Sequence, residues 1–218
     1  MGVVSILIAD DHAVVRRGLR ALLETKPGWK IVSEESNGRE AVAKAVKLAP
    51  DIAILDISMP GLNGFDATTL ILKARPETRV LILTMHSAEE LIKKTLAAGA
   101  RGYVLKSDAE RDLITAVESL LQGKTFFTSV ASEVILNKLR GGNSHTEAER
   151  TRGERLSPRE REIVQLLAEG RSNKEVAGVL NISTRTVENH RAKVMEKLNL
   201  RSLSDLIRYA IRNKMVEP

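Results

Sequence analysis

The stretch that decides the fold is residues 51–56, DIAILD, in which four apolar residues run between two aspartates. A run of this length, followed by Met-Pro-Gly at residues 59–61, is typical of a short buried strand closed by a turn. The same character recurs along the first half of the chain, at residues 4–9, 30–33, 79–84 and 102–106.

Amphipathic helical patterns separate these runs, and one more follows the last of them. Apolar residues at 14, 15, 19, 22 and 23 mark the first helix, and the others are expected near residues 39–48, 65–74, 88–98 and 109–122. Buried strands that alternate with helices are typical of a parallel sheet covered on both faces. We therefore predict an α/β domain over residues 4–122, built on a doubly wound five-stranded parallel sheet.

The pattern changes after residue 122. Residues 123–155 have no regular apolar periodicity beyond one expected helix at Ser129–Leu139, so we predict a linker there. Residues 156–218 have purely helical periodicity, and Ser157, Pro158 and Glu160 form a strong helix start. A tight turn at residues 181–183 joins two of the expected helices, which predicts a second, smaller all-α helix-turn-helix domain.

Composition restricts the kind of protein further. The chain has no cysteine, which excludes a disulfide framework and a thiolate metal site. Neither a signal peptide nor an apolar stretch long enough to span a membrane is present, so we expect a cytoplasmic protein without a membrane partner. Residues 141–218 carry 15 basic against 11 acidic residues, whereas residues 1–140 carry 19 against 17. This excess indicates a polyanion partner for the smaller domain, although a solvated basic surface explains it equally well.

Polar residues stand at the ends of four predicted strands: Asp10 and Asp11, Asp56, Thr84, and Lys106. The carboxyl ends of parallel strands share one edge of a sheet, where function collects. Three crowded carboxylates stay ionised only around a cation, and hard oxygen ligands favour Mg²⁺. Such a pocket suits phosphoryl transfer onto a carboxylate, with Asp56 as the nucleophile. Lys106 can neutralise one phosphoryl oxygen, and Thr84 can donate its hydroxyl to another.

Residues 5–122 resemble the receiver domains of bacterial response regulators. The resemblance is carried by ADDH at residues 9–12, LDISMPG at 55–61, LT at 83–84 and GYVLK at 102–106. It implies the flavodoxin-like receiver fold and an aspartyl phosphate on Asp56, formed with a phosphoryl group from a histidine kinase.

The resemblance also implies a ligand set and a switch. Mg²⁺ would be held by Asp11, Asp56 and the backbone carbonyl of Ser58, with Asp10 assisting through water. Thr84 and Tyr103 would form the switch pair, in which Thr84 moves toward the phosphoryl group and Tyr103 swings inward behind it.

Each of these residues also has a purely structural interpretation. Asp10 and Asp11 can cap the helix that follows them, and Thr84 can simply end a strand. Tyr103 lies on an apolar strand and can be plain core, and Lys106 can be an ordinary surface lysine. Their occurrence together at one predicted edge favours the functional interpretation.

The helix expected at residues 184–198 has the pattern of a recognition helix. Val187, Val194 and Leu198 form its buried stripe, and the opposite face presents Arg185, Glu188, Asn189 and Ala192. On such a face asparagine can pair with adenine, and glutamate can accept from the cytosine amino group. The side chains placed for DNA phosphates are Lys174, Thr184, Thr186, Arg191 and Lys193. His190 suits a packed position as well as a phosphate contact, and Ser172 and Asn173 suit helix caps better than DNA contacts.

Residues 156–216 resemble the LuxR-type helix-turn-helix domain of the NarL/FixJ branch of response regulators. The resemblance is carried by LSPRE at residues 156–160, GRSNKEVA at 170–177, IS at 182–183 and TVENH at 186–190. Glu188 stands where many relatives carry lysine, so the DNA sequence that those relatives read is not transferred to this chain.

Together these features predict a response regulator and transcription factor. Phosphorylation of Asp56 would shift it toward a homodimer that binds double-stranded DNA, and no enzymatic activity is expected beyond its own phosphorylation and dephosphorylation. The apolar residues between Leu203 and Ile211 offer either a dimer surface or core packing. Two alternatives remain: a Mg²⁺-dependent phosphatase or phosphotransferase that uses Asp56, and a transcription factor whose vestigial receiver ignores phosphorylation.

Overall fold

A computed structural model describes residues 3–85, 88–128, 156–213 and 215–216. The chain divides into two compact units, Met1–Arg140 and Gly141–Pro218, and each is described separately. The helix predicted at Ser129–Leu139 lies outside the described residues.

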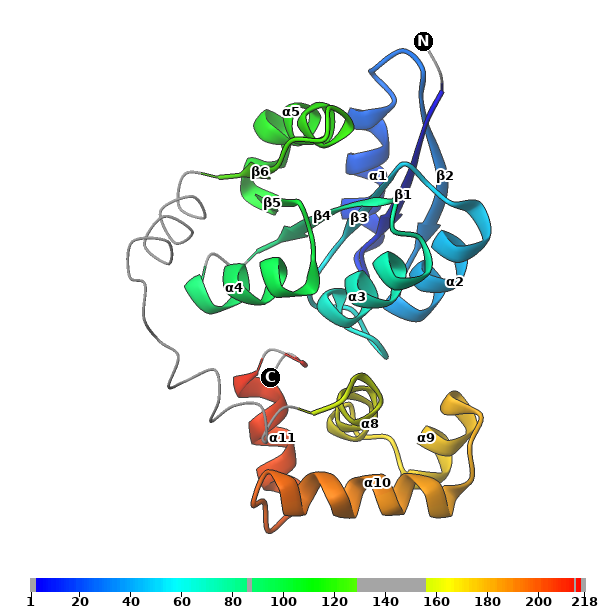
Figure 1. Ribbon diagram of the computed structural model, residues 1–218, viewed down its shortest axis with the longest axis vertical. Coiled ribbons are helices and arrows are strands. Elements are labelled where there is room, and N and C mark those ends of the chain that lie inside the picture. Colours follow the sequence, from blue (N-terminus) through cyan, green and yellow to red (C-terminus); the bar gives the residue numbers. More distant parts are fainter. Residues whose placement is uncertain (1–2, 86–87, 129–155, 214, 217–218) are drawn as a thin grey trace. The chain divides into compact units, whose positions relative to one another are not determined.

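The first unit alternates strands and helices along its whole length (Figure 1). Its elements are β1 (Val4–Ala9), α1 (Ala13–Leu23), β2 (Trp29–Glu35), α2 (Gly38–Leu48), β3 (Ile52–Leu55), α3 (Gly64–Ala74), β4 (Arg79–Thr84), α4 (Glu89–Ala98), β5 (Gly102–Leu105), the 3₁₀ turn η1 (Lys106–Asp108), α5 (Ala109–Leu121) and β6 (Phe126–Phe127).

All neighbouring strands pair in parallel, in the order β2-β1-β3-β4-β5-β6. The predicted doubly wound parallel sheet is confirmed, but among the described residues it has six strands rather than five. The extra strand β6 lies inside the stretch predicted as a linker, and its two residues are too few to show an alternating pattern. The strand order reverses between β1 and β3, and ligands of such sheets bind at the carboxyl ends of the strands at that point.

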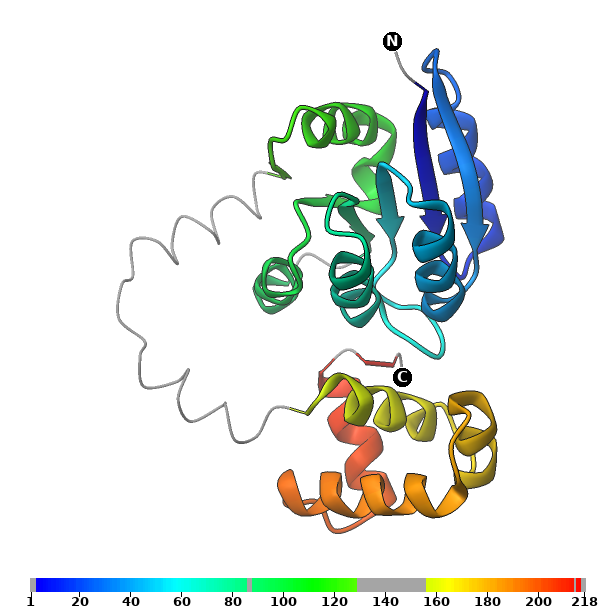
Figure 2. The ribbon, with the colours of Figure 1, turned by 45° about the vertical axis from the view of Figure 1, so that its right-hand side comes forward.

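Helices cover the sheet on both faces (Figure 2), and an apolar core lies on each face. Successive strand residues point to opposite faces, so Leu7 and Ala9 belong to one core while Ile6 and Ile8 belong to the other. Helices α2, α3 and α4 cover the first face, and α1 and α5 cover the second. With both faces buried, the polar residues that follow the strands are left at the edges of the sheet.

The second unit is entirely helical in its described part, with α8 (Pro158–Ala168), α9 (Asn173–Leu180), α10 (Thr184–Lys197) and α11 (Leu203–Arg212). Serine caps all four helices, at positions 157, 172, 183 and 202, and the first two belong to reciprocal capping boxes with glutamate. The turn between α9 and α10 begins with Asn181 at φ 51°, a left-handed conformation that asparagine tolerates. The predicted small all-α domain with its helix-turn-helix is therefore confirmed. No helix of the described chain is both long and apolar enough to cross a membrane.

Candidate phosphorylation pocket and DNA-binding helix

The predicted acidic edge is a real cluster at the point where the strand order reverses. Asp10 directly follows β1, and Asp56 directly follows β3, its neighbour in the sheet. The Asp56 amide donates to the Ala9 carbonyl at 2.8 Å, which fixes the two strand ends side by side. Both carboxylates are buried, with Asp10 1% and Asp56 4% exposed. Buried carboxylates need partners, and the neighbouring side chains supply them.

Lys106 bridges the two buried carboxylates. Its Nζ lies 2.7 Å from Asp56 Oδ2 and 2.8 Å from Asp10 Oδ2, and only 10% of its side chain is exposed. The other oxygen of Asp56, Oδ1, accepts a hydrogen bond of 2.7 Å from the amide of Ile57. The interpretation of Lys106 as an ordinary surface lysine is therefore wrong.

Burial and charge act in opposite directions on this pocket. Burial raises the pKa of the Asp56 carboxyl, and the charge of Asp10 adds to that effect, whereas Lys106 and the Ile57 amide lower it. Burial alone would lower the pKa of Lys106, but its hydrogen bonds to Asp10 and Asp56 outweigh burial and raise it. The lysine therefore remains a cation beside a carboxylate that is costly to keep ionised.

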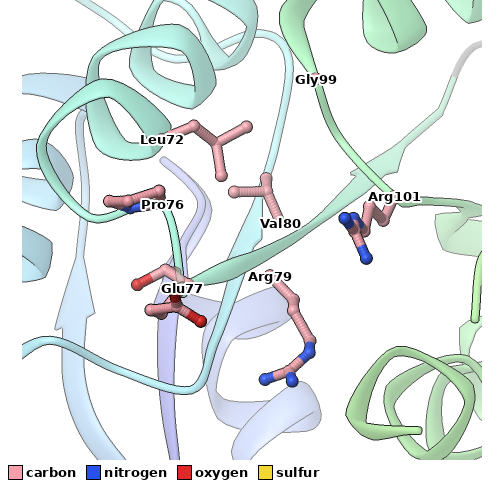
Figure 3. A pocket seen from close by; sticks show the side chains of 8 residues that line it. Leu72, Pro76, Glu77, Arg79, Val80, Gly99 and Arg101 are labelled. Carbon is pink, nitrogen blue, oxygen red and sulfur yellow. The ribbon is translucent and has the colours of Figure 1, made fainter. Parts of the chain in front are cut away.

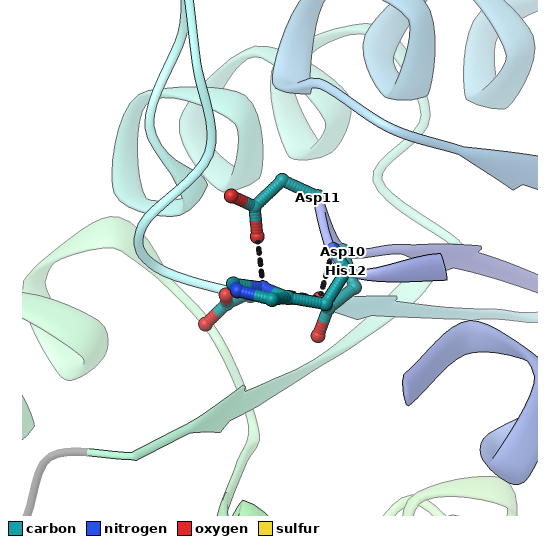
Figure 4. Close-up of side chains that lie close together, drawn as sticks. Asp10, Asp11 and His12 are labelled. Atoms are coloured by element: carbon teal, nitrogen blue, oxygen red, sulfur yellow. Dashed lines mark hydrogen bonds and ion pairs between the residues drawn. The ribbon is translucent and has the colours of Figure 1, made fainter. Parts of the chain in front are cut away.

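Asp11 lies beside the buried pair and has a partner that the sequence did not predict. His12 Nδ1 lies 2.6 Å from Asp11 Oδ1 and 3.5 Å from Asp10 Oδ1 (Figure 4). The His12 amide also donates to Asp10 Oδ1 at 2.9 Å, and His12 itself occupies the N-cap of α1 without a capping side-chain bond. Asp10 and Asp11 are thus not the N-cap of α1. The only sequence signal for these contacts was that His12 directly follows the two aspartates.

The donor set fits a hard divalent cation. One ligand atom from each of Asp10, Asp11, His12 and Asp56 lies within 4.8 Å of the others. Three of these groups are carboxylates, which Mg²⁺ prefers, whereas an imidazole suits softer metals. Ser58, whose carbonyl the resemblance assigns to the metal, is half-buried in the loop that begins at Asp56.

A glycine holds the loop after β3 against the backbone of Asp56. The Gly64 amide donates to the Ile57 carbonyl at 2.9 Å. A Cβ at Gly64 would lie 2.1 Å from the Asp56 carbonyl oxygen, far inside van der Waals contact. Only glycine permits this approach, so residue 64 helps to set the position of the Asp56 backbone.

The two predicted switch residues lie on neighbouring strands. Thr84 is the last residue of β4 and is 1% exposed, and Tyr103 is the second residue of β5 and has no exposed surface. Burial raises the pKa of the Tyr103 phenol to about 12. Tyr103 is thus a core residue here, in the inward position that the resemblance assigns to the phosphorylated form.

A separate cavity of about 100 Å³ opens at the opposite edge of the sheet, beside the amino end of β4 (Figure 3). It is lined by Leu72, Pro76, Glu77, Thr78, Arg79, Val80, Gly99 and Arg101. Because parallel strands place their two ends at opposite edges, this cavity is not part of the acidic pocket.

Helix α10 exposes the side chains predicted to read DNA. Arg185, Glu188 and Asn189 are exposed, while Val187 and Val194 are fully buried on the other side of the helix. Arg185 Nη1 lies 4.0 Å from Glu188 Oε2, and their side chains are 83% and 47% exposed. This contact is too long and too exposed to hold either side chain in place.

The residues predicted for DNA phosphates are less uniform. Lys174, Thr184 and Lys193 are exposed, whereas Thr186, His190 and Arg191 are half-buried. The Thr186 hydroxyl lies 2.8 Å from that of Ser183, the N-cap of the helix, so it takes part in the cap. Ser172 is the N-cap of α9, as expected, and Asn173 is the first residue of that helix.

A parallel sheet with an acidic pocket and a bridging lysine, followed by a helix-turn-helix unit, defines the class of the two-component response regulators. Residues 6–118 match the response regulator receiver domain family, and residues 154–210 match the luxR family of bacterial regulatory proteins. The chain belongs to the response regulators of the NarL/FixJ family, with a receiver domain and a LuxR-type DNA-binding domain.

Individual relatives support this assignment over nearly the whole chain. The oxygen regulatory protein NreC of Staphylococcus carnosus is 40% identical over 97% of this chain and 99% of its own. The RcsB response regulator of Salmonella typhimurium is similar in structure, with a TM-score of 0.58 and 31% identity over 96% of this chain and 98% of that one. A structure of two RcsB dimers bound to two parallel DNAs has a TM-score of 0.57 and 29% identity, over 94% and 96%. The chain is thus a transcription regulator, and the alternative of an enzyme acting on an external substrate is wrong.

Proposed function

We propose that Asp56 accepts a phosphoryl group from a histidine kinase in the cytoplasm and that this modification controls DNA binding. The observation that carries the proposal is the buried triad of Asp10, Asp56 and Lys106, with its 2.7 and 2.8 Å contacts. A cation already beside the nucleophile can pair with the negative charge that a phosphoryl group brings. A vestigial receiver would have no need for such a buried and costly arrangement.

Mg²⁺ bound by Asp11, Asp56 and the Ser58 carbonyl, with Asp10 assisting, would neutralise phosphoryl oxygens during the transfer. The four clustered ligand atoms within 4.8 Å support this assignment. His12, now paired with Asp11, would have to give up that contact when Asp11 turns to the metal. Lys106 would then pair with the phosphoryl group.

The switch would follow from the same geometry. Thr84, at the end of β4, would donate its hydroxyl to the phosphoryl group, and buried Tyr103 would fill the space behind it. Phosphorylation can shift the equilibrium between two receiver states only by the difference in free energy that the contacts of Thr84 and Tyr103 make between those states.

The second domain would bind double-stranded DNA through α10. Its exposed Arg185, Glu188 and Asn189 would face base edges. Phosphate contacts would come from the flanking set of Lys174, Thr184, Thr186, His190, Arg191 and Lys193, of which Thr186, His190 and Arg191 are half-buried.

Dimerisation would use α11. Leu206 and Ala210 of this helix are buried in the domain core, so these two residues serve core packing and are not part of a dimer surface. Leu203, by contrast, is 41% exposed, and Ile207 and Ile211 follow it at intervals of four residues and are only half-buried. Residues spaced by four share one face of a helix, so they form an apolar stripe suited to a second copy.

The test is phosphotransfer from acetyl phosphate in the presence of Mg²⁺, followed by DNA binding. Wild-type protein is expected to take one phosphoryl group and to bind DNA more tightly afterwards, and Asp56→Asn is expected to take none. The matched control is Asp51→Asn at the other end of the same strand, where the carboxylate accepts hydrogen bonds from the Ser5 amide and hydroxyl at 2.8 and 2.6 Å.

Labelling of Asp56→Asn at the wild-type level would refute the assignment of the nucleophile. Labelling without any change in DNA affinity would instead favour the vestigial receiver. Asp51→Asn is expected to label like the wild type, since that carboxylate lies at the opposite edge of the sheet.

A further inference from the structure

The short strand β6 connects the switch residue Tyr103 to the segment that leads toward the DNA-binding domain. β6 pairs in parallel with β5, with Gly102 opposite Phe126 and Tyr103 opposite Phe127. It is the last strand in the order of the sheet, next to β5. The described part of the receiver ends directly after it, at Thr128 (Figure 1). Whatever moves Tyr103 therefore acts next to the last strand that the structure describes in this unit.

The two phenylalanines of β6 face different cores. Phe127 packs against the core that contains Tyr103, on the face covered by α2, α3 and α4. Phe126 packs against the opposite core, on the face covered by α1 and α5. Paired residues of neighbouring strands share a face of the sheet, so Phe127 is the β6 side chain that lies on the side of Tyr103.

The backbone holds β6 only weakly. The strand has two residues, and within the described part of the chain it pairs with β5 alone. At its start, the Phe126 amide donates to the Arg101 carbonyl at 3.0 Å. Because so few ladder bonds are available, the side-chain packing of the two phenylalanines decides whether the strand stays paired.

The Phe126 side of the strand faces Gly102 rather than the switch tyrosine. A Cβ at Gly102 would lie 2.4 Å from Leu81 Cδ1 and 3.1 Å from Leu120 Cδ1, so these two leucines already occupy the space above the glycine. The Phe127 side differs, because the large side chain of Tyr103 fills the core there with no exposed surface. If Tyr103 turned outward, it would leave a cavity beneath Phe127 and remove its support.

We propose that Phe127 is a positioning residue for the switch tyrosine: β6 is paired with β5 when Tyr103 is buried and is released when Tyr103 turns outward. This inference rests on the proposed role of Thr84 and Tyr103 as the switch. Coupling between two sites is reciprocal, so a docked β6 also favours the buried Tyr103. The phosphorylated receiver would thus keep β6 paired with β5, and the unphosphorylated receiver would release it.

The experiment compares Phe127→Ala with Phe126→Ala in the full chain. Both variants shorten a half-buried phenylalanine of the same strand, but only the first acts on the core of Tyr103. DNA affinity is measured before and after labelling with acetyl phosphate and Mg²⁺, at equal labelling of Asp56. Phe127→Ala is expected to reduce the gain in affinity at least about fivefold, the lower end of usual coupling between sites, and Phe126→Ala by less than about twofold.

A second readout follows β6 directly. Hydrogen exchange of the Phe126 amide is expected to slow in wild-type protein when beryllofluoride and Mg²⁺ are added, and to stay fast in Phe127→Ala. If Phe127→Ala or Phe126→Ala prevents folding, which the emission of Trp29 would show, Phe127→Leu and Phe126→Leu give the same comparison with a smaller expected difference.

Three results decide the matter. A gain in DNA affinity that is unchanged in Phe127→Ala overturns the inference. An equal loss of that gain in both variants also overturns it, because the cause would then be the pairing of β6 as a whole and not packing on the side of Tyr103. Wild-type protein that takes no label or gains no affinity would instead overturn the proposed function, and the inference with it.

Discussion

The acidic pocket and the exposed face of α10 are the two proposed functional sites, and their side chains are held in different ways. In the pocket, Asp10, Asp56 and Lys106 come from three strand ends and hold one another at 2.7 and 2.8 Å. On α10, Arg185 and Asn189 stand in solvent, and the nearest ion pair is the loose 4.0 Å contact to Glu188. The protein itself fixes the geometry of the first site, whereas under the proposed function DNA would fix the geometry of the second.

This difference decides what a substitution does. A change in the pocket leaves buried groups without partners and is expected to affect stability as well as function. A change on the α10 face removes a contact that exists only in the complex, so it is expected to affect binding alone.

The largest effect is expected for Lys106→Ala, which leaves two buried carboxylates facing each other. Removing one partner of a buried ion pair costs about 3–5 kcal/mol. The change should be measured by urea unfolding in the presence of a chelator, followed through Trp29, the only tryptophan of the chain, which lies in β2 of the receiver. Lys26→Ala is the control, because it removes an exposed pair with Glu118 and should cost less than about 1 kcal/mol.

The loss in Lys106→Ala also has an expected pH dependence. Burial already raises the pKa of Asp56, and removal of the lysine takes away the main opposing effect. A carboxyl with a folded pKa above its unfolded value reduces stability as pH rises from the unfolded toward the folded pKa. The destabilisation by Lys106→Ala should therefore be larger at neutral than at acidic pH. If Lys106→Ala and Lys26→Ala lost equal amounts of free energy of unfolding, the buried triad would be contradicted.

A smaller effect is expected for Gly64→Ala. The new Cβ would lie 2.1 Å from the Asp56 carbonyl oxygen, so the loop has to shift. Overpacking of this kind costs about 1–3 kcal/mol, and the displaced Asp56 should label more slowly with acetyl phosphate.

Gly18→Ala is the matched control within the same domain. Gly18 lies in α1, and a Cβ there would meet nothing within 4 Å. Alanine is a better helix former than glycine, so this variant should gain about 0.5–1 kcal/mol and label normally. If both variants changed the free energy of unfolding in the same direction, Gly64 would not constrain the Asp56 backbone.

Most of the fold and the pocket could be predicted from the sequence, for a physical reason. Parallel strands align their carboxyl ends, so Asp10, Asp56 and Lys106 meet once their strands are recognised by their apolar runs. The family resemblance then supplied the roles that strand positions alone do not give. The caps at Ser157 and Ser172 were equally accessible, because a serine followed by glutamate three residues later needs only local contacts.

What could not be predicted depends on contacts that local patterns do not encode. A two-residue strand such as β6 has no periodicity, and its pairing depends on an edge provided by β5. The pairing of His12 with Asp11 depends on the rotamers of two adjacent side chains rather than on their spacing. The number of strands and the partner of Asp11 therefore had to come from the structure.

On the α10 face, Asn189→Ala is expected to change specificity without changing stability. Loss of a bidentate contact to a base costs about 1–3 kcal/mol of discrimination, so affinity for the preferred sequence should fall toward the non-specific level. Lys193→Ala is the control: loss of a phosphate contact should weaken binding to all sequences and reduce the salt slope by about 1. Uniform weakening by Asn189→Ala would assign this residue to the DNA backbone instead.

The smallest effect is expected at the start of α11, where Asp205 closes the cap. Its carboxylate accepts hydrogen bonds from Arg208 at 2.7 Å and from the Ser202 hydroxyl at 2.8 Å, and these contacts lower its pKa to about 2. A carboxyl with a lowered pKa contributes its stability above the ordinary value of 3.8 and loses it as pH falls toward 2. Thermal unfolding of α11 should thus become acid-sensitive in this range, and Asp205→Asn should remove that sensitivity.

The matched control for Asp205→Asn is Glu196→Gln, which neutralises an exposed carboxylate of α10 outside this cap. It should leave the acid sensitivity of the domain unchanged, and a similar change in both variants would mean that net charge rather than the cap is responsible. Because the contacts of Asp205 span only residues 201–208, labelling of Asp56 should be the same in both variants. A cap so local can weaken the helix that carries the apolar stripe of Leu203, Ile207 and Ile211 without touching the receiver. Under the proposed dimerisation through α11, a loss of dimer near pH 3 that occurs in the wild type and not in Asp205→Asn would therefore come from this cap.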